Sequence, residues 1–287
     1  EKGQRAGREA ADNRLQDALP PVTKLATATA WEARAFVQKA LREERVYLAF
    51  QPVVSSLAPR PLAFFEALLR IESEDGTEVL PGAFLGKIAG SPEALALDQA
   101  VLRMALKTLA DTPDLRLSVN LSAATIADEI WLSILQGGTA EQPDLAFRLI
   151  VEISEDADLF DTAEAQTFIA ALRRMGVTVA LDDFGAGATM LRHLPKARFD
   201  VLKIDGSLCR GVAGSMDMQC ILQAVVDIAR HLDMLTVAEF ISSEADAAMA
   251  MRLGVDCLQG SHFGMAAPLE GARPALLQNR GIQRQRA

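Results

Sequence analysis

Short apolar segments alternate along this chain with longer segments that have helical periodicity. Eight of the short segments are apolar or rich in residues that favour strands, and turn residues separate them from their neighbours. They cover residues 46–54, 62–70, 115–120, 147–153, 177–182, 200–205, 235–239 and 255–259. The helical patterns cover residues 31–45, 94–111, 122–136, 161–175, 215–232 and 242–253.

This alternation predicts a protein of the α/β class. A regular succession of strand and helix is typical of parallel sheets, and eight such units favour a closed (β/α)8 barrel of the TIM type. An open, doubly wound sheet is the alternative. That fold more typically carries a glycine-rich phosphate loop after its first strand, and no such loop follows residues 46–54.

The two ends of the chain differ from this pattern. Residues 1–29 are rich in Ala, Arg, Glu and Gln and contain Pro20-Pro21, so we expect a linker or the end of an upstream helix. We expect residues 30–272 to form the barrel domain and residues 273–287 a polar C-terminal tail. No apolar run is long enough to span a bilayer, and no secretory signal pattern begins the chain. We therefore expect a cytoplasmic domain, with any sensor or membrane anchor of the full-length protein upstream of it.

The composition narrows the class of function. The chain has 287 residues, of which 50% are hydrophobic, and this is enough for one large domain. Its net charge of -9 argues against direct binding of nucleic acid, which needs a basic face, but allows a small phosphorylated ligand held through metal ions. The three cysteines and three histidines lack the spacing of a zinc site, and we expect the cysteines to be free thiols.

Polar or ionisable residues stand at or near the end of every expected strand. In a closed β/α barrel the carboxyl ends of the strands meet at one face, where barrel enzymes carry their active sites. A single glutamate at a strand end is usually a solvated edge residue, but the same coincidence at every strand indicates a site. The residues are Gln51, Glu66, Asn120, Glu152, Asp182 with Asp183, Lys203, Glu239 and Gln259.

The carboxylates of this set outnumber its cations, because five of them accompany Lys203 alone. Crowded carboxylates repel one another unless cations neutralise them. All candidate ligands are oxygen donors, which selects Mg²⁺, Mn²⁺ or Ca²⁺ over zinc or copper. The adjacent Asp182 and Asp183 can share two such ions about 3.5–4 Å apart.

Strand alternation adds two residues to the site. In FFEALLR (64–70), Glu66, Leu68 and Arg70 fall on one face of the strand. Arg70 is then available to bind a phosphate, because its planar guanidinium matches the geometry of that group. A structural ion pair is the alternative for Arg70.

The order of these residues resembles that of EAL domains, the cyclic di-GMP phosphodiesterases. The tripeptide Glu66-Ala67-Leu68 carries the family's signature, and we take a second copy, Glu93-Ala94-Leu95, as a chance match on a helix. The other motifs follow in order: FQPVV (50–54), SVNLS (118–122), VEISE (151–155), DDFGAG (182–187), LKID (202–205), Glu239 after Ala238, and Gln259-Gly260.

This resemblance implies a fold, a reaction and partners. The fold is a (β/α)8 barrel whose first strand runs antiparallel to the others. The reaction is hydrolysis of cyclic di-GMP to linear pGpG by a water activated between two Mg²⁺ or Mn²⁺ ions, with Ca²⁺ inhibitory. The partners are cyclic di-GMP, an upstream sensory or regulatory region of the same chain, and a second copy in a homodimer.

The resemblance also implies metal-binding and catalytic roles. Lys203 would stabilise the attacking water or the charge that develops on the phosphorus. Glu239 would bind a metal-bound water or accept its proton. The metal ligands would be Glu66, Asn120, Glu152 and Asp182 for one ion and Asp182 with Asp183 for the other, and the catalytic residues Glu66, Asp182, Asp183, Lys203 and Glu239.

Further roles concern the substrate. Gln51, Leu68, Arg70 and Gln259 would bind the dinucleotide. Glu155 would anchor the loop after Asp183.

Three segments depart from the family pattern. The family usually reads EGVE where this chain reads Glu239-Phe240-Ile241-Ser242, so a bulky aromatic side chain replaces a glycine. Ala188-Thr189-Met190 replaces a loop that usually carries Tyr and Ser, and Ser261-His262 follows Gln259-Gly260 where an aromatic residue is usual. The implied metal ligands are all retained, but changes around such ligands can lower metal affinity or rate by about 10–100-fold.

Two other functions stay open at this point. A receptor that binds cyclic di-GMP without hydrolysing it and signals to a protein partner is favoured by Phe240. The retained carboxylates favour the enzyme, because a receptor has no physical need for them. An unrelated metal-dependent barrel that acts on another phosphorylated or enolisable substrate would bind no guanine dinucleotide.

Overall fold

The computed structural model describes residues 25–154, 162–187, 191 and 194–270, and their Cα positions fall into two compact units. The smaller unit contains the described chain up to Tyr47 together with Leu69–Leu97, and the larger unit contains Leu48–Leu68 and the described chain from Asp98 onward. Strands β1 (Val46–Ser55) and β2 (Leu62–Glu72) and helix α5 (Pro92–Asp111) have residues in both units.

The smaller unit is built around helix α3 (Ala30–Arg42). Thr29 and Glu32 form a capping box at its start, in which Glu32 Oε2 accepts from the Thr29 backbone N–H at 2.7 Å and Thr29 Oγ1 accepts from the Glu32 N–H at 3.3 Å. Val37 of α3 is buried in one cluster with Ile71 and Phe84. Among its further described elements are β3 (Glu78–Val79), η1 (Pro81–Ala83) and α4 (Leu85–Ile88).

Eight strands form a closed barrel in the order β1-β9-β8-β7-β6-β5-β4-β2, with β2 pairing back to β1. All neighbours from β2 round to β9 are parallel, whereas β1 pairs antiparallel with β9. This confirms the expected (β/α)8 barrel with an antiparallel first strand. The strands after β3 are β4 (Leu117–Leu121), β5 (Leu149–Ser154), β6 (Thr178–Phe184), β7 (Val201–Ile204), β8 (Leu235–Ala238) and β9 (Cys257–Gln259).

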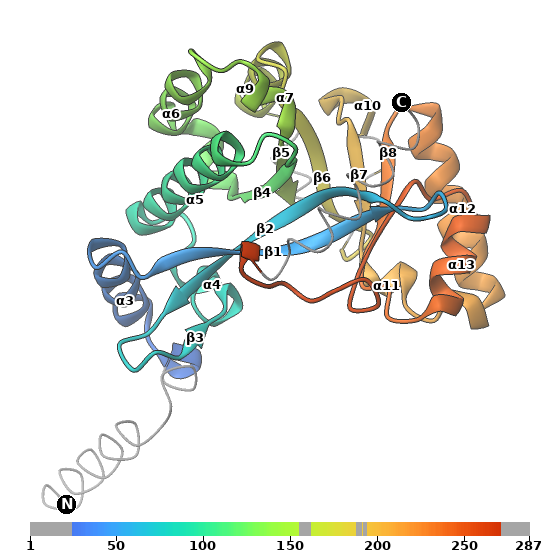
Figure 1. The fold of residues 1–287 in the computed structure, drawn as a ribbon, viewed down its shortest axis with the longest axis horizontal. Coiled ribbons are helices and arrows are strands. Elements are labelled where there is room, and N and C mark those ends of the chain that lie inside the picture. The colour runs from blue at the N-terminus through green and yellow to red at the C-terminus, as the bar shows by residue number, and fades with distance from the viewer. Residues whose placement is uncertain (1–24, 155–161, 188–190, 192–193, 271–287) are drawn as a thin grey trace, which may run out of the picture. The chain divides into compact units, whose positions relative to one another are not determined.

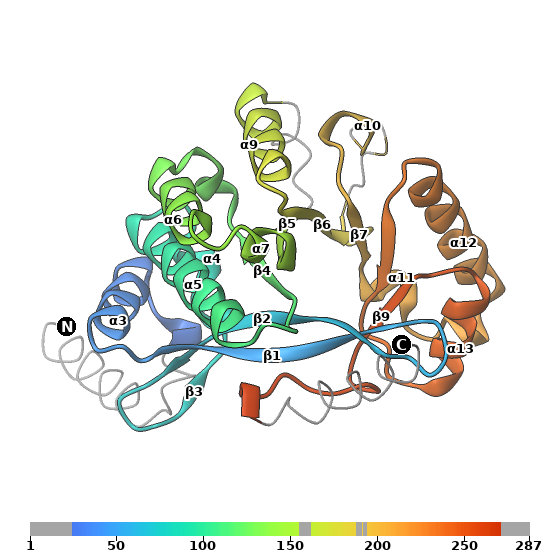
Figure 2. The ribbon, with the colours of Figure 1, turned by 45° about the horizontal axis from the view of Figure 1, so that its top comes forward.

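Helices follow most of the barrel strands, and Figures 1 and 2 show α9, α12 and α13 on the outer side of the strands. The expected helix over 122–136 is wrong as one element: it is split at Asp128, which caps α6 by accepting from the Ile130 N–H at 2.9 Å. The helical elements are η2 (Ala123–Ala127), α6 (Glu129–Thr139), α7 (Asp144–Arg148), α9 (Ala163–Arg174), α10 (Leu194–Ala197), α11 (Gly206–Cys209), η4 (Val212–Gly214), α12 (Met216–His231) and α13 (Glu244–Arg252).

Cys209, Cys220 and Cys257 are free thiols, as expected. Within the described ranges, no helix combines the length and the apolar character needed to cross a bilayer. The domain boundaries at residues 29/30 and 272/273 stay predictions.

A layer of apolar side chains inside the barrel lies one level below the candidate site. Because successive residues of a strand point to opposite faces, a residue and the one two positions later face the same interior. Strand β1 runs in the opposite direction, so there the site residue Gln51 stands two positions before the apolar residue Val53. The buried cluster is Phe64, Ile150, Ala180, Val201, Val237 and Val53, and the corresponding site residues are Glu66, Glu152, Asp182, Lys203, Glu239 and Gln51.

Candidate functional site

Lys203 of β7 lies among four carboxylates. Its Nζ atom lies 2.7 Å from Glu152 Oε2, 2.9 Å from Asp182 Oδ1, 2.9 Å from Glu239 Oε1 and 3.5 Å from Glu66 Oε2. The lysine side chain is 1% exposed. Burial alone would lower the pKa of Lys203, but the four carboxylates hold it well above its usual value. Lys203 is therefore a fixed positive charge within an acidic site.

The carboxylates around Lys203 are crowded, and burial perturbs them. Burial raises the pKa of Glu152 well above its usual value although Lys203 opposes this. Burial likewise raises the pKa of Glu239 to about 7, again against the attraction of Lys203. Burial and the neighbouring charge of Asp182 both raise the pKa of Asp183. One lysine therefore does not neutralise the group.

Two amide side chains hold the carboxylate of Glu66. Asn120 Nδ2 donates to Glu66 Oε1 at 2.8 Å, and Gln259 Nε2 donates to Glu66 Oε2 at 2.6 Å. Burial alone would raise the pKa of Glu66, but the charge of Lys203 and these two donors lower it. Gln259 Nε2 also donates to Gln51 Oε1 at 3.4 Å, so residues from β1, β2, β4 and β9 are joined in one network.

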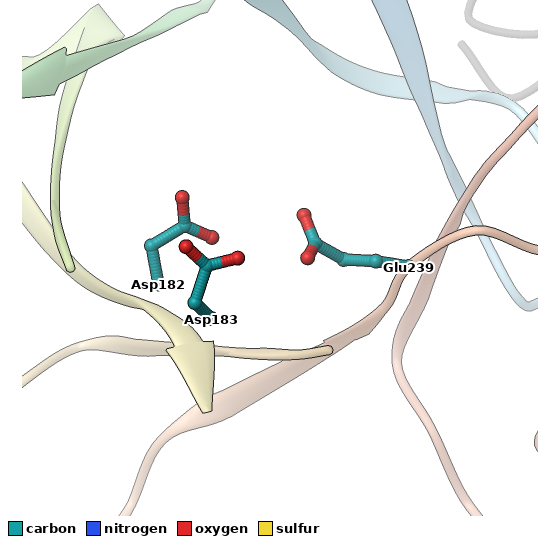
Figure 3. A group of neighbouring side chains, drawn as sticks. All are labelled: Asp182, Asp183 and Glu239. Atoms are coloured by element: carbon teal, nitrogen blue, oxygen red, sulfur yellow. The ribbon is translucent and has the colours of Figure 1, made fainter. Parts of the chain in front are cut away.

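Asp182 and Asp183 both reach the site because β6 is irregular where they stand. The register with β7 shifts between Leu181 and Phe184, and Asp183 has a φ of 57°. In a regular strand two adjacent side chains point to opposite faces, so this bulge re-aims Asp183. Figure 3 shows Asp182 and Asp183 coming from β6, with the carboxylate of Glu239 turned toward them. One oxygen of each of these three carboxylates lies within 4.8 Å of the others.

This donor set fits hard divalent cations. The cluster of Asp182, Asp183 and Glu239 contains only carboxylate donors, which suit Mg²⁺ and Mn²⁺. Glu152 Oε1 and Gln259 Oε1 are buried and accept no hydrogen bond from the described part of the chain. A bound cation would offset the surplus of negative charge around Lys203. Glu66, Asn120 and Glu152 are linked to this cluster through Lys203 and hydrogen bonds, and Glu239 is a direct member of it.

A cavity of about 530 Å³ adjoins these groups, which is within the range of small-molecule sites. Asn120 and Glu152 are not among its lining residues. Eight of the expected site residues line it: Gln51, Glu66, Leu68, Asp182, Asp183, Lys203, Glu239 and Gln259. Six further lining residues were not expected as site residues from the sequence: Arg210, Phe240, Ser242, Gly260, Ser261 and Met265.

One further expected site residue of the described chain, Arg70, is not among the residues that line the cavity. Arg70 belongs to the smaller unit, where its Nε lies 3.5 Å from Glu78 Oε1 and its Nη1 donates to the carbonyl of Leu69 at 2.8 Å. This contact is the structural ion pair that the sequence offers as the alternative role of Arg70. Phosphate binding by Arg70 stays a prediction. Glu155 and the departing segment Ala188-Thr189-Met190 lie outside the described residues.

One residue that supports the site was missed by sequence reasoning. Asp98 Oδ2 accepts hydrogen bonds from the Ser122 backbone N–H at 3.0 Å, the Ser122 hydroxyl at 2.6 Å and the Thr125 hydroxyl at 2.5 Å. It thereby fixes the turn that directly follows Asn120 and β4. Asp98 lies in the middle of a helical pattern, where no spacing signal marks it.

Fold and site together define a closed β/α barrel with an acidic, oxygen-donor site at the ends of its strands. The family model of the EAL domain matches residues 34–266. The chain therefore belongs to the EAL domain family.

Named relatives and a solved structure agree with this assignment. An uncharacterized protein of Mycobacterium tuberculosis (strain H37Rv) is 30% identical over 241 residues, which cover 80% of this chain and 78% of that protein. The cyclic di-GMP phosphodiesterase PdeF of Escherichia coli K12 is 30% identical over 238 residues, covering 81% of this chain and 31% of PdeF. A complex of the MucR phosphodiesterase with c-di-GMP has a TM-score of 0.74 and 29% identity, covering 84% of this chain and 99% of that one.

Proposed function

We propose that this barrel hydrolyses cyclic di-GMP to linear pGpG with the help of two divalent cations, Mg²⁺ or Mn²⁺. One observation carries the proposal: Asp182, Asp183 and Glu239 bring their carboxylates together beside Lys203 at a cavity of about 530 Å³. The names of PdeF and MucR, both phosphodiesterases, supply the substrate.

The ions would be held by the oxygen donors at the strand ends. Glu66, Asn120, Glu152 and Asp182 would bind one ion, and Asp183 would join Asp182 at the second. When bound, such ions polarise water and offset the charge of the phosphodiester. Ca²⁺ would occupy the same donors and support binding without turnover, because it holds its ligands in a looser geometry.

The side chains of this chain would do the remaining work. Lys203 keeps its charge in the site and would stabilise the charge that develops on the phosphate oxygens. Glu239 faces the two aspartates, and it would accept the proton of the attacking water. Gln51, Leu68 and Gln259 line the cavity and would position the dinucleotide.

Partners outside the site follow from the same proposal. PdeF is much longer than its matched part, and a sensory or regulatory region that accompanies the barrel in this protein stays a proposal. A homodimer, a cytoplasmic location, phosphate binding by Arg70 and loop anchoring by Glu155 stay predictions.

A receptor without turnover is the second candidate, and the observation that favours it is Phe240, which lines the cavity directly after Glu239.

The test is to incubate the protein with cyclic di-GMP and Mg²⁺ or Mn²⁺ and to separate the products by chromatography. Metal-dependent linear pGpG at enzymatic rates supports the enzyme. Binding in Ca²⁺ with no product in Mg²⁺ or Mn²⁺ supports the receptor, and absence of both overturns the two candidates.

A further inference from the structure

Arg210 and Phe240 form a stacked pair on the wall of the cavity. Arg210 follows α11, and Phe240 follows Glu239 after β8. The Arg210 Cζ atom lies 4.3 Å from the centroid of the Phe240 ring, which is the geometry of a cation–π contact. Both residues line the cavity, and Phe240 is 49% exposed, so this residue is partly open to a ligand.

The position of the Phe240 ring is specified by its surroundings. Phe240 has a φ of 55°, a left-handed conformation that favours glycine and is rare for a bulky residue. Gly206 leaves the space that the ring uses, because a Cβ atom at that position would come within 2.6 Å of Phe240 Cδ2. Strained backbone of this kind persists where the surrounding structure holds it, and it gathers at ligand sites.

Lys203 and Arg210 both line the cavity, but they differ in how far carboxylates enclose their charge. The charge of Lys203 is enclosed by four carboxylates. Within the described residues, Arg210 takes part in no salt bridge, and its Cζ atom lies over the ring of Phe240. A cation–π contact does not use the N–H donors of a guanidinium, so the donors of Arg210 remain available to a ligand.

We propose that Arg210, supported by Phe240, binds one guanine base of the dinucleotide, an inference that rests on the proposed function. Guanine presents two acceptors, O6 and N7, to which an arginine donates two parallel hydrogen bonds. The exposed part of Phe240 offers an aromatic surface on which a base can stack, whereas a phosphate has no aromatic face and cannot. Adenine carries a donor where guanine carries O6, so Arg210 sets a preference for guanine.

The test compares cyclic di-GMP with cyclic di-AMP. Dissociation constants are measured by calorimetry in Ca²⁺ for the wild type, Arg210→Ala and Arg210→Lys. The alanine variant should bind cyclic di-GMP about tenfold more weakly or worse, and cyclic di-AMP with little change. Arg210→Lys should not restore binding, because a point charge cannot replace the planar guanidinium.

Phe240→Leu, which removes the stacking surface, should weaken binding of cyclic di-GMP about two- to fivefold. Arg230→Ala on α12, a matched loss of an exposed arginine, should change neither constant.

Hydrolysis of bis(p-nitrophenyl) phosphate in Mn²⁺ separates base binding from chemistry, because this diester carries no guanine. Arg210→Ala should raise the KM for cyclic di-GMP and leave hydrolysis of the small diester unchanged. Equal losses for both dinucleotides would assign Arg210 to a phosphate, and no loss would make the pair structural; either result overturns the inference while the proposed function stands. A wild type that neither binds nor hydrolyses cyclic di-GMP would overturn both.

Discussion

Replacing Lys203 by methionine should destabilise the metal-free protein strongly. Methionine keeps an unbranched side chain of similar length, so the change removes the charge and the N–H donors. The side chain is 1% exposed, and its Nζ lies within 3.5 Å of four carboxylates. Removing one partner of a buried ion pair costs about 3–5 kcal/mol, because the remaining charge is left buried without compensation.

The buried carboxylates can take up protons, which limits the loss of stability in Lys203→Met and makes this loss depend on pH. A carboxyl group with the ordinary pKa of 4.5 costs about 3.4 kcal/mol to keep protonated at pH 7, at about 1.4 kcal/mol per pH unit. Burial already raises the pKa of Glu239 to about 7 and that of Glu152 well above 4.5, and loss of Lys203 raises both further. Groups whose folded-state pKa exceeds the unfolded value lose stability as pH rises. The deficit of the variant should therefore be largest at pH 8 and shrink toward pH 5.

The assay is urea unfolding followed by circular dichroism, in EDTA, between pH 5 and pH 8. Lys107→Met is the matched control, because Lys107 pairs with Asp111 at 3.0 Å but is 78% exposed, and its loss should leave the free energy of unfolding nearly unchanged. Mn²⁺ should return part of the stability of Lys203→Met, since a bound cation replaces the lost charge. If the two variants unfold at the same urea concentration, Lys203 does not hold the carboxylates together.

Three further predictions follow from other contacts. Phe240→Gly should be more stable than Phe240→Ala by about 1 kcal/mol in thermal unfolding, because only glycine adopts a φ of 55° without strain; the reverse order would show that the backbone is relaxed there. Asp98→Ala should lower the free energy of unfolding by about 1–3 kcal/mol and Asp98→Asn by less, since the amide still accepts from Ser122; equal losses would argue against the hydrogen bonds as the cause. Glu66→Ala and Asp182→Asn should lower hydrolysis of cyclic di-GMP by more than about 100-fold while the circular dichroism spectrum is kept, and near-normal turnover of either with Mg²⁺ would contradict the two-metal assignment.

The barrel and much of its site could be predicted from the sequence because the signal is periodic. A buried Phe64 two positions before Glu66, or Val201 before Lys203, places each polar side chain at the same end of the barrel interior. This pattern does not depend on tertiary contacts, so it can be recognised in a single sequence.

Contacts between distant loops could not be predicted in this way. Nothing in the periodicity places Arg210 over Phe240, because two irregular segments bring them together. The bulge at Asp183 is likewise invisible, since strict alternation would have turned that side chain away from Asp182. The expected helix over 122–136 is divided into two elements for a local reason, because Asp128 caps the start of a new helix.

The most direct measurement is mass spectrometry of the products that the wild type makes from cyclic di-GMP in oxygen-18 water. With Mn²⁺ we expect linear pGpG that carries a single oxygen-18 atom on its new terminal phosphate, and no product in EDTA. Such a product requires attack by a water on one phosphodiester with metal present, as the acidic cluster beside Lys203 implies. Bound but intact cyclic di-GMP in Mn²⁺, or pGpG formed at the same rate in EDTA, would contradict hydrolysis by this site.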